Sequence, residues 1–317
     1  MMSITSFMVL VTLIVSATPL YAWYPRAAEE RSIADKGPAP VIGVNRYYQI
    51  AEGETLIQLA RAFGLGYTNV AQANPRLDPW LPTVGKTMVL PYATILPRDL
   101  QPGITINLAD YRLYLVQGHK HNRSVRIYPV GIGVEGWETP LGDFKVLHKT
   151  PRPTWNVPAS IRKRDPSLPR RVRPGPDNPL GDYWMAFTRR RHGIHGTNEP
   201  YGVGRRVSHG CIRLYPEDIK DLYRRAPIGT PVHVIYEPVK VGFVNGAVYL
   251  EVHPDYLNTA LTVDETLHQR CDELGCPGVF DTSQILFATE NRLGYPLAVS
   301  SHSGELAYQP DIPSPKQ

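Results

Sequence analysis

The strongest constraint on the fold is a run of three short segments within residues 103–130, in which apolar and polar side chains alternate. The segments cover residues 104–106, 112–116 and 124–130, and turn-forming residues separate them. Because side chains on a strand point alternately to opposite faces, this pattern predicts an antiparallel meander. Further strand-like segments at 144–147 and 232–236 extend the prediction to a mainly β domain over residues 101–237.

Two segments of this region depart from the strand pattern. Residues 152–180 are rich in proline and arginine and show little periodicity, which predicts an exposed loop or lid. Pro216 opens a predicted helix whose apolar face consists of Ile219, Leu222, Tyr223 and Ala226. In a C-terminal extension, 238–317, residues 241–252 predict one more hairpin, and the tail from Ser303 is proline-rich and expected to be loose.

The N-terminal part of the chain has a different texture. Within residues 45–92 a short strand at 48–50 is followed by apolar residues at helical spacing, namely Leu56, Leu59, Ala60 and Phe63. A second short helix at 69–73 and a strand that ends near 91 complete a predicted β-α-α-β order. Residues 23–44, with three prolines and charges of both signs, are predicted to be a linker.

Residues 1–22 carry no charged side chain and include an apolar stretch at residues 7–15. This pattern predicts a secretory signal peptide that is cleaved after Ala22, and therefore export. An uncleaved membrane anchor is the alternative, but the apolar core is shorter than the roughly 20 residues that a membrane span needs.

The charge of the chain excludes one class of function. With 34 Lys and Arg against 29 Asp and Glu, the net charge is +5, which is too small and too dispersed for a nucleic-acid-binding surface. The densest basic run, Arg189–Arg191, is interpreted as a solvated surface, with contact to an acidic partner as the alternative.

Three cysteines become informative once export is expected. Cys271 and Cys276 lie close together, and in an oxidising compartment they predict a disulfide. A zinc site is an alternative for this pair, but a second ligand pair at suitable spacing is missing. A redox-active pair is a further alternative. Cys211 is left as the unpaired thiol whose presence needs an explanation.

Cys211 has the surroundings of a catalytic nucleophile. A thiol reacts as thiolate, and its ordinary pKa near 8.5 leaves it mostly protonated at neutral pH, so a histidine must take the proton. His195 and His209 are both near in the chain. His209, two residues away, would lie beside the sulfur, whereas His195 comes from a separate strand and can face it across a cleft. We therefore predict Cys211 as nucleophile and His195 as general base.

The residues around Cys211 suggest how a negative charge would be stabilised. Gly210 allows a close approach of the backbone to a ligand, and the N–H groups of His209, Gly210 and Cys211 are predicted to converge on a developing oxyanion. A metal site made of His192, His195, His209 and Cys211 is the alternative. It lacks a nearby carboxylate and a paired ligand spacing, so we expect no metal and no cofactor.

These residues resemble the motif of the YkuD-type L,D-transpeptidases: a histidine, a gap, then Ser-His-Gly-Cys, a hydrophobic residue, and Arg or Asn. The resemblance covers residues 103–236 and includes Thr-Pro-Leu-Gly at 139–142 and Asn-Pro-Leu-Gly at 178–181. It implies a β-sandwich or barrel-like catalytic domain. It also implies a thioester between Cys211 and the third residue of a peptidoglycan tetrapeptide stem.

The same resemblance implies roles for the neighbouring residues. His195 would be the base, and the backbone carbonyl of Gly196 would orient its ring. His209 and Arg213 would shape the oxyanion and acyl-donor site, and Ser208 would support the loop.

Residues 45–92 resemble a LysM module through Gly-Glu-Thr-Leu at 53–56, Ala-Asn-Pro at 73–75 and the closing stretch at 85–91. This resemblance implies binding to the N-acetylglucosamine-containing glycan of peptidoglycan. The alternative is a small α/β subdomain that only positions its neighbour.

The order of signal peptide, LysM-like module, catalytic domain and extension resembles periplasmic Gram-negative members that act in cell-wall biogenesis and cell shape. The acyl acceptor stays open between the lysine of an outer-membrane lipoprotein, which the module and extension slightly favour, and another stem's diamino acid in a 3→3 cross-link. A third variant hydrolyses the lipoprotein linkage.

A thiol reductase is an expected partner, because an exposed ionised cysteine is open to oxidation. A non-catalytic wall-binding protein is the alternative from another class.

Overall fold

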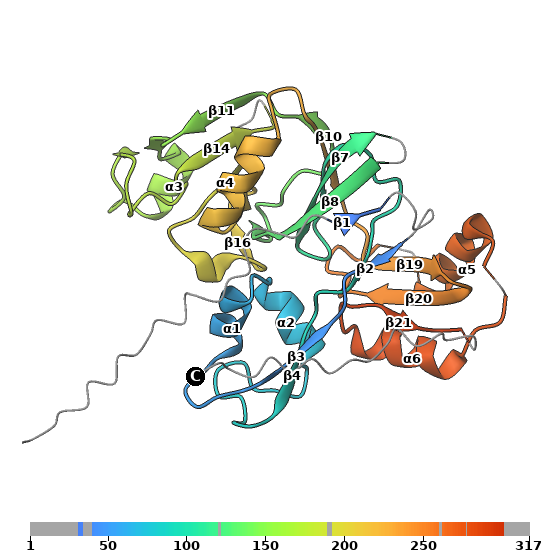
Figure 1. The fold of residues 1–317 in the computed structure, drawn as a ribbon. Helices are drawn as coiled ribbons and strands as arrows, with labels where there is room; N and C mark the ends of the chain where they lie inside the picture. Colours follow the sequence, from blue (N-terminus) through green and yellow to red (C-terminus); the bar gives the residue numbers. More distant parts are fainter. Residues whose placement is uncertain are drawn as a thin grey trace, which may run out of the picture.

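Three regions of regular structure follow one another along the chain in the computed structural model (Figure 1). The structure describes residues 31–33, 40–119, 122–188, 192–259, 262–276 and 278–300. The predicted signal peptide, the basic run 189–191 and the tail from Ser303 lie outside these ranges. None of the described helices is both long and apolar enough to cross a bilayer.

The N-terminal region confirms the predicted β-α-α-β order. Its elements are β3 (Arg46–Gln49), α1 (Leu56–Ala62), α2 (Tyr67–Ala73) and β4 (Thr87–Leu90), and β3 pairs antiparallel with β4. Thr55 caps α1, because its side chain accepts from the Gln58 N–H while the Gln58 side chain accepts from the Thr55 N–H. The apolar faces of these elements form a small core of their own, which includes Ile50, Leu56, Leu59, Val70 and Met88.

The prediction of a linker over residues 23–44 is wrong for two short stretches. β1 (Arg31–Ser32) pairs with a strand of the central sheet, and β2 (Val41–Ile42) pairs with β5 (Thr94–Ile95). The neighbouring Ile33 and Ile42 are buried in a cluster with residues of the central region. Two-residue strands are too short to produce a detectable periodicity, so the sequence gives no sign of them.

The central region confirms the predicted meander and the mainly β class. Its larger sheet has the order β1-β8-β7-β6-β18-β10. The strands other than β1 are β6 (Gly103–Asn107), β7 (Arg112–His119), β8 (Asn122–Pro129), β10 (Gly142–Lys145) and β18 (Pro231–Ile235). β18 pairs parallel with β6, so the end of the domain returns to its first strand.

A second sheet lies across the core from the first. It has the order β11 (His148–Pro151), β14 (Tyr183–Ala186), β15 (Gly193–His195) and β17 (Ile212–Arg213). A separate parallel pair joins β9 (Ile132–Gly133) to β16 (Arg206–Ser208), and a 3-10 turn, η2, covers Pro200–Gly202. The core holds side chains from both sheets together with Ile219 and Leu222 of the predicted helix, α4 (Pro216–Arg225).

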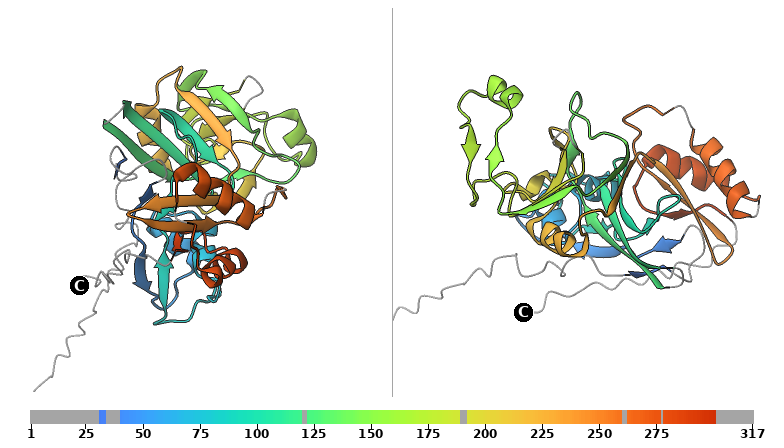
Figure 2. Two further views of the ribbon diagram at one scale, coloured as in Figure 1. Left: turned by 90° about the vertical axis from the view of Figure 1, so that its right-hand side faces the viewer. Right: turned by 90° about the horizontal axis from the view of Figure 1, so that it is seen from above.

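The insertion at 152–180 contains more regular structure than its composition indicates. A two-stranded sheet of β12 (Trp155–Asn156) and β13 (Arg171–Val172) encloses α3 (Ala159–Arg164), and the unit projects away from the rest of the molecule (Figure 2). Asn178 closes its base by donating its side-chain amide to the Pro153 carbonyl at 2.8 Å. No residue of α3 is buried, so the insertion is an exposed lobe.

The C-terminal extension forms a compact α/β unit. The predicted hairpin is present as β19 (Val239–Val244) and β20 (Ala247–Val252), with β21 (Leu297–Ala298) at the edge. Helices α5 (Val263–Leu274) and α6 (Thr282–Asn291) pack on this sheet. Cys271 and Cys276 lie at the end of α5 as free thiols, so the predicted disulfide is not formed in the structure.

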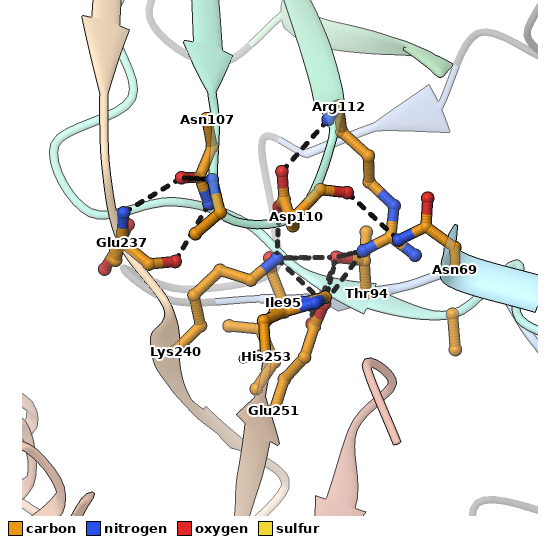
Figure 3. Close-up of polar contacts among 12 residues, drawn as sticks. Asn69, Thr94, Ile95, Asn107, Asp110, Arg112, Glu237, Lys240, Glu251 and His253 are labelled. Atoms are coloured by element: carbon orange, nitrogen blue, oxygen red, sulfur yellow. Dashed lines mark hydrogen bonds and ion pairs between the residues drawn. The ribbon is translucent and has the colours of Figure 1, made fainter. Parts of the chain in front are cut away.

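A buried ion network joins the central region to the C-terminal unit (Figure 3). The Lys240 Nζ atom lies 2.8 Å from Asp110 Oδ2 and 2.9 Å from Glu251 Oε1, and Arg112 binds the same Glu251 oxygen at 2.8 Å. Thr94 donates its hydroxyl to Glu251. Two cations balance two carboxylates, which a buried charge cluster requires if it is not to be strongly destabilising.

Asp110, Glu251 and His253 place possible ligand atoms within 4.8 Å of one another, as a metal site would. Lys240 and Arg112 already supply the positive charge at this position, so the geometry is explained by ion pairing.

Candidate active site

The strands β15 and β17 bring the two predicted reactive residues to one place. They run parallel, with Ile194 opposite Ile212 and His195 opposite Arg213. Ile194 and Ile212 point into the core. Because side chains alternate, the opposite face carries His195 and, one step earlier on the neighbouring strand, Cys211. His195 and Cys211 therefore come from neighbouring strand segments and lie on the same face of the sheet.

His195 is fixed in the orientation that a general base needs. Its Nδ1 atom lies 2.6 Å from the carbonyl oxygen of Gly196, which is the contact that the family resemblance implies. A carbonyl only accepts, so Nδ1 carries the proton and Nε2 is left with a free lone pair. Burial lowers the pKa of His195 to about 3, and the charge of Arg213 acts in the same direction. The ring is therefore neutral at physiological pH, with its Nε2 atom unprotonated.

Cys211 is partly accessible and is held as a thiol. Burial raises its pKa above the ordinary value, whereas a hydrogen bond from the Gly193 N–H and the charge of Arg213 act in the opposite direction. The resting pair is therefore a neutral thiol and a neutral imidazole. The N–H of Gly193 and the guanidinium of Arg213 are then in place to stabilise the thiolate when the proton leaves.

The loop before Cys211 depends on residues that the motif contains. The Ser208 hydroxyl donates to the Cys211 carbonyl at 2.6 Å, which ties the two ends of the loop together. Gly210 has a φ of +92°, and a Cβ there would lie 2.9 Å from the His192 ring and 3.0 Å from the Glu138 carbonyl oxygen. The turn therefore requires glycine for both its backbone conformation and its space.

Arg213 and His209 lie on either side of the nucleophile in the chain and have different surroundings. Arg213 is mostly buried, pairs with the exposed Glu199 at 3.5 Å, and exchanges two backbone hydrogen bonds with Gly131. His209 is exposed, and its ring meets the edge of Trp137 at a centroid distance of 5.1 Å. Both residues adjoin the site. Arg213 has the more direct effect on the reactive pair, because its charge acts on the pKa values of both His195 and Cys211.

Trp184 and Gly193 belong to the site although sequence reasoning did not select them. Trp184 stacks on the His195 ring, with centroids 5.6 Å apart. A Cβ on Gly193 would lie 2.5 Å from the Trp184 ring, so the indole fits only against a glycine. Neither residue is titratable or nucleophilic, so neither stands out as a reactive group in the sequence. The one available indication is that Gly193 lies two residues before His195.

Comparison with known proteins agrees with this geometry. Residues 101–234 match the YkuD family, described as the L,D-transpeptidase catalytic domain. The protein named Probable L,D-transpeptidase ErfK/SrfK of Salmonella typhimurium is 34% identical over 309 residues, which covers 90% of this chain and 97% of that protein. Probable L,D-transpeptidase YbiS of Escherichia coli is 41% identical over 221 residues, which covers 67% of this chain and 71% of that protein.

A solved structure, L,D-transpeptidase 3 from Mycobacterium tuberculosis, is 20% identical with a TM-score of 0.33 and covers 47% of this chain and 67% of that chain. That likeness is too limited to carry a conclusion. The sequence matches define the class: an enzyme with a YkuD-type catalytic domain. The chain belongs to the L,D-transpeptidase family.

Proposed function

We propose that the enzyme transfers an acyl group from a peptidoglycan tetrapeptide stem to an amine through a thioester on Cys211. The observation that carries this proposal is the placement of His195 and Cys211 on one face of two adjacent strands, with the His195 Nδ1 proton held by Gly196. The neutral imidazole of His195 is in the protonation state from which it can take the thiol proton at the moment of attack.

In the proposed first step the Cys211 sulfur attacks the carbonyl carbon of the third stem residue, a diamino acid, and His195 takes the thiol proton. Backbone N–H groups of residues 209–211 stabilise the oxyanion. The carbon–nitrogen bond then breaks, and His195 gives its proton to the departing D-alanine amine. The product is a thioester on Cys211 and free D-alanine.

In the second step an acceptor amine attacks the thioester carbonyl while His195 takes a proton from the amine nitrogen. The carbon–sulfur bond breaks, the new amide forms, and the sulfur leaves as a thiol after receiving the proton. The acceptor is either a lipoprotein lysine or the diamino acid of another stem, and the N-terminal module and C-terminal unit favour the lipoprotein. In the hydrolase variant the donor would be the lipoprotein–stem amide: Cys211 attacks it, the lipoprotein lysine leaves as the amine with the proton from His195, and water then cleaves the thioester to a carboxylate and the free thiol.

The N-terminal module is proposed to hold the glycan strand near the site. Its β-α-α-β order agrees with the LysM resemblance, and Trp80, 59% exposed on the loop between α2 and β4, offers an aromatic face for a sugar ring. Together with the signal peptide predicted for residues 1–22, this supports action in the periplasm on the cell wall, where a thiol reductase would keep Cys211 reduced.

The test is acyl-enzyme formation on the full chain. Incubation with a tetrapeptide stem is expected to add the tripeptide mass to the peptide containing Cys211 and to release D-alanine. Cys211→Ala should show neither product. Cys276→Ala removes another partly accessible thiol and is the matched control, which should behave as the unaltered enzyme. An adduct that persists in Cys211→Ala contradicts the proposal.

Two further arms separate the alternatives. A carbapenem should acylate Cys211 and give a covalent mass shift, whereas a non-catalytic wall-binding protein should give none. Addition of a lipoprotein-derived lysine peptide or of a second stem then identifies the acceptor by the product that forms.

A further inference from the structure

The insertion at 152–180 presents a cluster of basic side chains without neutralising partners. Residues 159–173 contain six basic side chains, Arg162, Lys163, Arg164, Arg170, Arg171 and Arg173, and one acidic residue, Asp165. The Asp165 carboxylate accepts hydrogen bonds from the N–H and hydroxyl of Ser167. Within the described residues no ion pair joins any of the six to a carboxylate. The lobe therefore carries excess positive charge.

Arg164 connects this lobe to the nucleophile loop. Its guanidinium lies over the Trp137 ring at 4.6 Å from the centroid, and the Trp137 ring in turn meets the His209 ring. Burial lowers the pKa of His209, and the charge of Arg164 is the next largest cause. The Glu138 carbonyl, which follows Trp137, borders the Gly210 position. A continuous chain of side-chain contacts thus runs from the insertion to His209, two residues before Cys211.

The contact between Arg164 and Trp137 is one between a cation and an aromatic ring. Guanidinium N–H donors lie in the plane of the group, and they match the two oxygens of a carboxylate. Among the described residues no hydrogen bond from the Arg164 side chain is present. Trp137, 37% exposed, fixes the position of the charge without neutralising it.

We propose that Arg164, held in place by Trp137, binds a carboxylate of the acyl-donor peptide and so sets the preference of the site for acidic donors. This inference rests on the proposed function, because an acidic stem peptide is the donor that it assigns. Arg164 is a specificity-determining residue in this account, and the acyl transfer itself needs only the reactive pair and the loop.

The first experiment compares two donors without an acceptor, so that only thioester formation is measured. One donor is a tetrapeptide stem with free carboxylates, and the other is the same stem with its side-chain carboxylates amidated. Arg164→Ala should raise KM for the acidic donor about tenfold and leave KM for the amidated donor unchanged. Arg164→Lys should give an intermediate loss, because a lysine keeps the charge but not the planar guanidinium. Arg224→Ala, an exposed arginine at the end of α4, is the control and should match the unaltered enzyme.

A second experiment is independent of the enzyme's substrate. Alkylation of Cys211 by iodoacetate, an anion, is compared with alkylation by neutral iodoacetamide, and the modified peptide is followed by mass spectrometry. Arg164→Ala should lower the ratio of the two rates roughly threefold, and added salt should diminish the difference. Trp137→Leu should lower the ratio in the same way, because it releases the guanidinium.

The two experiments separate failure of the inference from failure of the proposed function. If Arg164→Ala changes neither the donor preference nor the alkylation ratio, the inference is overturned. If no thioester forms with any donor but the alkylation ratio still falls in Arg164→Ala, the carboxylate site stands and the assignment of the donor is wrong.

Discussion

The indole ring of Trp184 stacks on the imidazole ring of His195, with the two planes inclined by 23°. The indole covers one face of the His195 ring, and burial of that ring is the main cause that lowers its pKa to about 3. It also explains why the strand position beside it is Gly193, since a larger residue would displace the indole. The orientation and the protonation state of the base are thus determined together.

Replacing Trp184 by leucine should expose and loosen the His195 ring. Burial lowers the pKa of this histidine, so access of water should raise the pKa toward its ordinary value of 6.5. The acid limb of the acylation rate should then move to higher pH, and the maximal rate should fall about a hundredfold because the base is misplaced. The pH dependence of thioester formation measures both. An unmoved acid limb would show that Trp184 does not control the protonation of His195.

Cys211 should react as a thiol with a raised pKa. Burial is the largest cause of this shift, so the thiolate fraction should still be increasing at the upper end of the neutral range. The rate of alkylation of Cys211 by iodoacetamide should therefore increase continuously from about pH 6 to pH 9. A plateau reached near neutral pH would indicate a resting thiolate–imidazolium pair and contradict the neutral pair described above.

Gly210→Ala should abolish acylation while Gly246→Ala should not. Both glycines have positive φ, +92° and +80°, but a Cβ meets other atoms only at Gly210. Alanine at Gly246 should cost about 1–2 kcal/mol of stability from backbone strain alone. Alanine at Gly210 should also displace the loop before Cys211, whose N–H groups at residues 209–211 are proposed to stabilise the oxyanion. The acylation rate should therefore fall about a hundredfold or more. Urea unfolding and thioester formation are measured on both variants, and equal acylation rates would refute the loop's role.

Lys240→Met should destabilise the whole protein. It leaves the carboxylates of Asp110 and Glu251 buried with Arg112 as the one permanent cation among the four charged groups of the network, and an uncompensated buried charge costs about 3–5 kcal/mol. Lys220→Met, on the exposed side of α4, is the control and should change the free energy of unfolding by less than about 0.5 kcal/mol. Similar values for the two variants would mean that the ion network contributes little.

Trp80→Ala should weaken retention of the full chain on peptidoglycan several-fold without changing thioester formation on a soluble stem. The backbone N–H of Trp80 is held by the Asp78 carboxylate at 2.8 Å, so the loop should keep its shape when the indole is removed. Trp184→Leu is the reciprocal control and should keep its retention. Unchanged retention of Trp80→Ala would argue for a module that only positions its neighbour.

The sequence predicts those parts of the molecule that are encoded by local periodicity or by a contiguous motif. The meander at 104–130, helix α4 and the hairpin of β19 and β20 all follow from alternation or helical spacing. The motif around Cys211 predicts the reactive residues because chemistry restricts which residue types can perform acyl transfer. The geometry of His195 and Gly196 agrees with what the motif implies.

The features that the sequence does not reveal depend on contacts between distant residues. Lys240 binds Asp110 although the two residues are 130 residues apart in the sequence, and the local sequence around each gives no indication of the other. Strands β1 and β2 exist because Ile33 and Ile42 find apolar neighbours in other regions. Trp184 is an ordinary aromatic residue until the pairing of β14 with β15 places it over His195.

The ion network at the junction sets a condition on exchanging parts between relatives. The third region contributes Lys240 and Glu251, and the central region contributes Asp110 and Arg112. A chimaera that takes its C-terminal unit from another protein would bury an unmatched carboxylate and guanidinium unless the donor brings an ammonium and a carboxylate to the same places. The central region and the C-terminal unit can therefore be exchanged between relatives only when all four charged groups are kept. Charge matching at the junction determines where such an exchange is tolerated.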